Sequence, residues 1–88
     1  MKFYIIQLCR STAAYEAIPK KNARICLEKA AEKLIKSGYR VTNAGVLLIA
    51  GKDCEVTIYP SARLLIKTDD ESVAEDAADE IYRVLSLL

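Results

Sequence analysis

Hydrophobic and polar residues alternate along residues 54–68, and this alternation is the clearest pattern in the chain. A period of two residues with one apolar side is typical of an antiparallel sheet that is covered on one face only. It predicts strands at 54–59 and 63–68, joined by a turn at 60–62, with the second face open. One predicted face carries Val56, Ile58, Leu64 and Ile66, and the other carries Thr57, Tyr59, Arg63 and Lys67.

Two further segments have apolar residues at helical spacing, which predicts two amphipathic helices. The first runs over 20–36 and ends before Gly38, a residue suited to the left-handed conformation that follows a helix. The second begins near Ser72, which has capping-box spacing with Glu75, and runs to the end of the chain. The first apolar stripe consists of Ala23, Cys26, Leu27, Ala30, Ala31, Leu34 and Ile35, and the second of Ala74, Ala77, Ile81, Val84, Leu85 and Leu88.

The other residues predict three shorter strands and a loop. Residues 2–8 are rich in aromatic and β-branched side chains and are expected to form a strand, whereas 11–19 are expected to form a loop. Strands at 39–42 and 46–50 flank Asn43-Ala44-Gly45, where Asn and Gly supply the positive φ of a tight turn. The predicted order is strand, helix, four strands, helix (β-α-β-β-β-β-α).

Composition and pattern together predict one α+β domain spanning residues 1–88. A curved antiparallel sheet of about five strands is expected to carry both helices on one face. The 88 residues, of which 52% are hydrophobic, suffice for a single core. The apolar run at 3–9 is too short for a signal sequence or a membrane span, so we expect a soluble cytoplasmic protein with no membrane association.

The sequence offers little for catalysis, metal binding or a cofactor. It has no histidine, no glycine-rich phosphate loop and no nucleophile elbow, so we expect no enzyme activity. Three widely spaced cysteines without a Cys-x-x-Cys pair favour small buried side chains over a metal or redox role. Charge is uneven: residues 1–40 carry nine Lys or Arg against three acids (+6), and residues 41–88 carry four against nine (−5).

The predicted order, and above all the segment from Val56 through the last helix, resembles one repeat of the TATA-box-binding protein. The shared features are an apolar strand ending in an aromatic residue, a short turn, a basic residue, a second apolar strand and a Ser-led helix with an Ala-rich face. The resemblance extends from about Phe3 to Leu85. It implies that the open sheet face binds nucleic acid, with Tyr59 as a base-wedging aromatic and Arg63 as the basic residue after the turn.

The resemblance also implies roles for other residues of this face. Leu65 and Lys67 correspond to residues that form the floor of the family's DNA-binding face. Gln7 corresponds roughly to an Asn in the family's first strand that contacts the minor groove of DNA, and Thr57 lies on the same predicted face. The second wedge aromatic of the family is replaced here by Asn43 and Ala44. The residues also have simpler interpretations, with Tyr59 as a rim aromatic and Arg63 and Lys67 as solvated charges.

Two functional hypotheses follow. The first is a module that binds nucleic acid, duplex DNA included, as a homodimer that joins two sheets and completes a saddle. The alternative is a protein-interaction or assembly module that buries the open sheet or its edge without binding nucleic acid. A ferredoxin-like domain that binds a small ligand between subunits is a third, weaker hypothesis, because the predicted order ends in a helix and lacks a closing strand.

Overall fold

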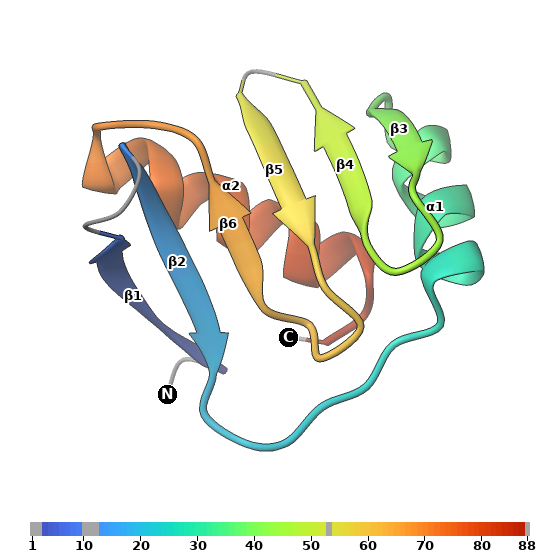
Figure 1. Ribbon diagram of the computed structural model, residues 1–88, viewed down its shortest axis with the longest axis horizontal. Coiled ribbons are helices and arrows are strands. Elements are labelled where there is room, and N and C mark those ends of the chain that lie inside the picture. Colours follow the sequence, from blue (N-terminus) through green and yellow to red (C-terminus); the bar gives the residue numbers. More distant parts are fainter. Residues whose placement is uncertain (1–2, 10–12, 53, 88) are drawn as a thin grey trace.

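A computed structural model describes residues 3–9, 13–52 and 54–87 and shows one six-stranded sheet with both helices on the same side (Figure 1). The strands lie in the order β1-β2-β6-β5-β4-β3, and every neighbouring pair is antiparallel. The architecture is therefore α+β with two layers, as predicted. Along the chain the elements are β1 (Tyr4–Cys9), β2 (Ala14–Pro19), α1 (Leu27–Lys36), β3 (Arg40–Asn43), β4 (Leu48–Gly51), β5 (Glu55–Ile58), β6 (Leu64–Ile66) and α2 (Glu71–Val84).

The sheet has six strands rather than about five, because β2 forms where a loop was predicted. Its sequence, Ala-Tyr-Glu-Ala-Ile-Pro, is poor in strand-forming residues. Pairing decides its conformation instead: β2 is bonded to β1 on one side and to β6 on the other, and Ala14 and Ala17 are fully buried. The predicted strand at 2–8 corresponds to β1, and β2 is the additional strand, so the observed order differs from the predicted β-α-β-β-β-β-α of a single TATA-box-binding-protein repeat.

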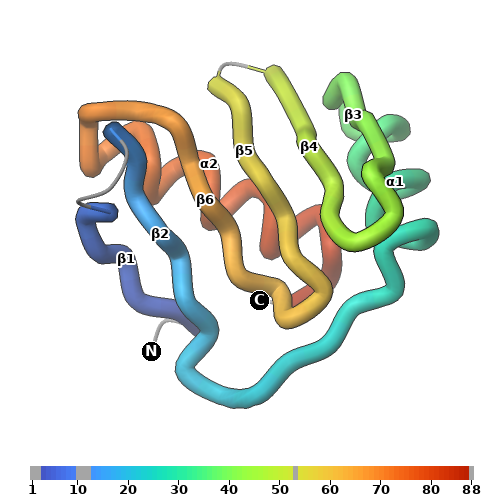
Figure 2. The backbone as a smooth tube through the Cα atoms, in the orientation of Figure 1, coloured from blue at the N-terminus to red at the C-terminus, as the bar shows by residue number. Residues whose placement is uncertain are grey.

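The first helix is shorter than predicted, because residues 20–26 cross the end of the sheet without regular structure (Figure 2). They lead from β2 to α1, which packs against β3 and β4 at the far side of the sheet. Four strand spacings of about 4.8 Å separate β2 from β3, so the connection must cover about 19 Å. Seven extended residues span about 23 Å, whereas the same seven residues in a helix span only about 10 Å. The Ile25 N–H bonds to the Pro60 carbonyl at 2.9 Å and fixes this crossing to a sheet turn.

The core lies between the sheet and the helices. The predicted inner face of the hairpin is confirmed, since Val56, Ile58, Leu64 and Ile66 are each at most 1% exposed. The helical stripes are confirmed only in part. In α1, Ile35 is 58% exposed, and in α2 the buried positions include Ala78 and Tyr82, which the pattern missed. Leu88 lies outside the described residues. The buried residues of α2 and its cap are Ala74, Ala78, Ile81, Tyr82 and Leu85.

Helix α2 begins with a different cap from the one predicted. Asp70, not Ser72, is the N-cap, and its Oδ1 accepts hydrogen bonds from the N–H groups of Ser72 (2.9 Å) and Val73 (3.3 Å). A carboxylate at this position satisfies two of the unpaired amides of the first turn and complements the helix dipole. Asp70 therefore has a structural role as the cap of α2.

Both helices end in the same hydrogen-bonded motif, with a left-handed residue after the cap. After α1 the N–H of Gly38 bonds to Ile35 O and that of Tyr39 to Leu34 O, with a φ of +94° at Gly38. This is the Schellman arrangement, and it confirms the predicted role of Gly38. After α2 the equivalent bonds run from Ser86 and Leu87 back to the helix, but here Ser86 holds the positive φ, at 61°.

Candidate nucleic-acid interface

The strand register brings all six predicted binding residues to the face of the sheet opposite the helices, here called the open face. Thr57 lies directly opposite Leu65, and Gln7 lies opposite Glu16, which in turn pairs with Leu65. These residues belong to one row across the strands. The row consists of Gln7, Glu16, Leu65, Thr57, Ile49 and Thr42.

A second row places the aromatic and basic residues of the hairpin side by side. The Tyr59 N–H donates to the Arg63 carbonyl at 3.0 Å, and the Arg63 guanidinium lies 5.3 Å from the centre of the Tyr59 ring. Tyr59 is half-buried, so one part of its ring lies against the protein. The pair offers an aromatic surface and a cation to the same ligand, a combination that suits a base and its phosphate.

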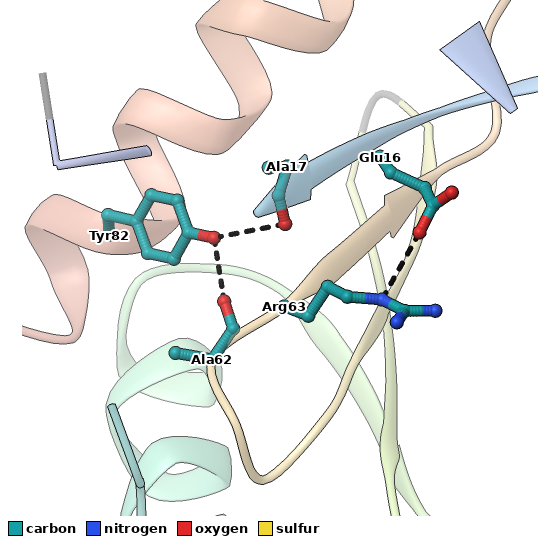
Figure 3. A network of polar contacts seen from close by, with 5 residues as sticks. All are labelled: Glu16, Ala17, Ala62, Arg63 and Tyr82. Atoms are coloured by element: carbon teal, nitrogen blue, oxygen red, sulfur yellow. Dashed lines mark hydrogen bonds and ion pairs between the residues drawn. The ribbon is translucent and has the colours of Figure 1, made fainter. Parts of the chain in front are cut away.

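Carboxylates on the open face partner both of the basic residues predicted there. Arg63 Nε lies 3.2 Å from Glu16 Oε2 (Figure 3), and Lys67 Nζ lies 2.8 Å from Glu55 Oε2. The Lys67 and Glu55 side chains are 56% and 47% exposed, so water screens their attraction. The sequence pattern missed the Glu16 partner, because Glu16 lies in the segment that was expected to be a loop.

Tyr82 anchors the turn that carries Arg63 from the opposite side of the sheet (Figure 3). Its hydroxyl donates to the Ala62 carbonyl at 2.6 Å and lies 3.5 Å from the Ala17 carbonyl. Burial raises the pKa of Tyr82 well above its ordinary value, so the hydroxyl keeps its proton. The helix layer thereby holds β2 and the turn before β6 together at the point where the Arg63 and Glu16 side chains meet.

A shallow hollow of about 170 Å³ lies at the end of the open face, beside the Tyr59 and Arg63 pair. Hydrogen-bond donors from two segments line it: Lys21 and Asn22 from the crossing segment, and Ser61 and Arg63 from the hairpin. Three apolar residues complete its lining, and none of the lining residues is a carboxylate. Cations and neutral donors suit an oxyanion such as a phosphate, which would compete with Glu16 for Arg63 and meet no acid at Lys21.

A second hollow, of about 420 Å³, lies toward the other end of the open face. Gly51 contributes to it by having no side chain, and a Cβ built there would meet nothing within 4 Å. Arg40 and Glu55 flank Gly51 in the strand register. The open face is therefore hollowed near both ends, with at least one basic side chain at each hollow.

The charge asymmetry of the sequence becomes a contrast between the acidic helix α2 and the more basic open face. Seven of the chain's twelve acids lie between residues 69 and 80, in α2 and the turn that precedes it. Helix α2 lies behind the sheet, on the side away from the open face (Figure 1). Bases instead gather on the open face and along its end. Arg40, Arg63 and Lys67 belong to the sheet and its turns, Lys20, Lys21 and Arg24 to the crossing segment, and three further lysines, Lys29, Lys33 and Lys36, lie on α1.

The helix side of the sheet has a hollow of its own. A hollow of about 240 Å³ between α2 and the sheet is bordered by Lys52 and Glu80, which form an ion pair at 3.0 Å. Lys52 lowers the pKa of Glu80. In the described ranges 3–9, 13–52 and 54–87, no group of three or more potential ligands could hold a metal ion, and no helix is long and apolar enough to cross a membrane. Contrary to prediction, Cys26 is exposed, while Cys9 and Cys54 are half-buried.

No known protein family, curated protein or solved structure matches the chain with significant similarity. The fold and the site therefore define the class: a small α+β domain whose antiparallel sheet has one face free of helices. That face is hollowed near its ends and bordered by basic side chains.

Proposed function

We propose that the open face binds nucleic acid, in a domain that resembles one repeat of the TATA-box-binding protein. The contrast between the acidic helix α2 and the bases of the open face and its end carries this proposal. A polyanion is attracted to the basic side of a molecule and repelled by the acidic side, so the field orients the open face toward it.

The end of the open face provides the first contact with a strand. A backbone phosphate fits the hollow bordered by Lys21, Ser61 and Arg63, and the neighbouring base stacks on the exposed part of Tyr59. Leu65 and Thr57 form the floor beyond this contact, where Thr57 is only 9% exposed and serves as surface rather than as a hydrogen-bonding group. We therefore expect the open face to recognise the phosphate backbone and to stack on a base, with little preference for sequence.

The ion pairs on the open face predict modest affinity. A phosphate that approaches Lys67 or Arg63 competes with Glu55 or Glu16 for the same cation. Because these cations are already neutralised, they contribute less to counterion release than unpaired bases such as Lys21 do. Binding should therefore be clear at low salt and much weaker at physiological salt.

Fluorescence anisotropy tests the proposal with duplex DNA, single-stranded DNA and an RNA–DNA hybrid, each at low and physiological salt. Lys21→Glu and Tyr59→Ala are expected to weaken binding several-fold. Lys29→Glu is the matched control, because it makes the same charge change on the exposed side of α1. Absence of binding to all three ligands at low salt, or equal losses for Lys21→Glu and Lys29→Glu, would contradict the proposal.

A protein-assembly function is the second candidate, and a specific observation favours it: the edge strand β1 carries no charge. Assembly through this edge is compatible with nucleic-acid binding on the open face and does not require it.

A further inference from the structure

The two edges of the sheet differ in how well they are protected from pairing with another chain. The β3 edge is four residues long, begins with the exposed Arg40 and packs against α1. The β1 edge is six residues long, and its sequence, Tyr-Ile-Ile-Gln-Leu-Cys, has no charge, proline or glycine. Natural proteins usually blunt an edge with charges, proline, bulges or a short strand. Strand β1 has none of these features.

The register of β1 shows which backbone groups point away from the sheet. The Lys20 N–H donates to the Phe3 carbonyl at 2.9 Å, so this pair is bonded across the two strands. Bonded and non-bonded pairs alternate in an antiparallel ladder, which directs the N–H and C=O groups of Ile6 and Leu8 outward. Pro19 lies at a non-bonded position of β2, as its missing N–H requires.

The side chains of β1 add apolar surface to this edge. Leu8 is 58% exposed and Ile5 is 47% exposed, and they lie on opposite faces of the strand. Both are among the large apolar residues that are exposed to solvent in the described parts of the chain. A partner strand at this edge would cover both of them and satisfy the outward backbone groups.

We propose that β1 pairs antiparallel with β1 of a second copy of this chain, about a two-fold axis. In such a pair residue i opposes residue j and j opposes i, so a charge near the two-fold axis would lie close to its own copy in the partner. The uncharged sequence of β1 avoids this repulsion. The two sheets then form one continuous sheet, with the open faces of both copies on the same side.

The size of the interface sets the expected strength of this dimer. Six paired residues extend over about 20 Å, and the area buried by an edge-to-edge contact is smaller than the roughly 1,600 Å² of a standard interface. The dimer is therefore expected to dissociate on dilution, in the micromolar range. This proposal rests on the edge strand alone and stands whether or not the open face binds nucleic acid.

Sedimentation velocity without nucleic acid, from low micromolar to near-millimolar protein, tests the proposal. The wild-type chain is expected to shift from monomer to dimer, and Leu8→Lys is expected to remain monomeric across this range. Val46→Lys is the matched control, because Val46 is 74% exposed in the turn between β3 and β4, at the far edge of the sheet. It should dimerise like the wild type.

Amide hydrogen exchange of the unmodified chain provides a test that no folding defect can affect. The amides of Ile6 and Leu8 should exchange more slowly as the protein concentration rises, while amides in α1 should not change. A monomer at all concentrations would overturn the proposal. So would a dimer that survives Leu8→Lys, or one whose formation leaves the exchange of these two amides unchanged.

Discussion

Replacing Glu55 by glutamine is expected to strengthen nucleic-acid binding, although it removes an ion pair. Glu55 Oε2 lies 2.8 Å from Lys67 Nζ on the open face and competes with any phosphate for that cation. A phosphate on Lys67 would lie about 6 Å from the Glu55 charge, and their repulsion at an effective dielectric between those of protein and water is about 1 kcal/mol. The variant should therefore bind about five-fold more tightly at low salt.

The salt dependence of binding by this variant provides a second, independent test. An unpaired Lys67 adds one cation to the contact, so the slope of log affinity against log salt should steepen by about 0.9 for duplex DNA, or about 0.7 for a single strand. Folding stability should change little, because an exposed ion pair contributes about 0–1 kcal/mol. Anisotropy titrations at several salt concentrations measure both the affinity and the slope.

Glu80→Gln is the control for this prediction. It also breaks an exposed ion pair, with Lys52 at 3.0 Å, but this pair lies beside α2 and not on the open face. The control should bind like the wild type. Weaker or unchanged binding by Glu55→Gln, or an equal gain in Glu80→Gln, would refute the reasoning.

Three further predictions concern stability. Ser86→Gly should raise the free energy of unfolding by about 1 kcal/mol and the melting temperature by several degrees. The left-handed conformation costs a serine about 1–2 kcal/mol, and the larger conformational entropy of glycine in the unfolded chain offsets only part of this gain. Tyr82→Phe should lower this free energy by about 1–3 kcal/mol, measured by urea unfolding, because the Ala62 carbonyl loses a buried donor. The contribution of Tyr82 and Tyr4 to stability should be constant below about pH 10 and fall above it, because burial raises the pKa of both and the unfolded chain releases their protons first.

Matched variants check these three predictions. Gly38→Ser places the same strain after α1 that Ser86 has after α2, so it should destabilise the fold by a similar amount. Tyr59→Phe removes a hydroxyl from the open face and should leave stability unchanged. The loss of stability at alkaline pH should be smaller in Tyr82→Phe than in the wild type, and an equal loss would show that Tyr82 does not cause it.

The hairpin could be predicted because its pattern is local. Val56, Ile58, Leu64 and Ile66 alternate with residues that are polar or aromatic except for Leu65, and a period of two residues has one structural interpretation at this length. The same register placed Thr57 and Leu65 on the open face without knowledge of the other strands. Gly38 could also be assigned, because the left-handed position after a helix strongly favours glycine.

The elements that sequence reasoning missed depend on distant partners. Strand β2 forms because β1 and β6 bond to it, and its own residues do not favour a strand. Residues 20–26 carry a helical pattern, but the distance between β2 and α1 requires an extended chain. The pairing of Arg63 with Glu16 could not be predicted, because Glu16 belongs to β2 and 47 positions separate the two residues along the chain.

An NMR titration of the isotopically labelled protein with a short oligonucleotide at low salt tests the central proposal most directly. The account predicts that amide signals of Gln7, Thr57, Tyr59 and Leu65, together with those of Lys21 and Ser61, shift in proportion to the ligand added. Signals of α2 should remain unchanged, because its acids face away from the ligand. Shifts confined to the helix layer, or no shifts at all, would contradict the assignment of the open face as a nucleic-acid interface.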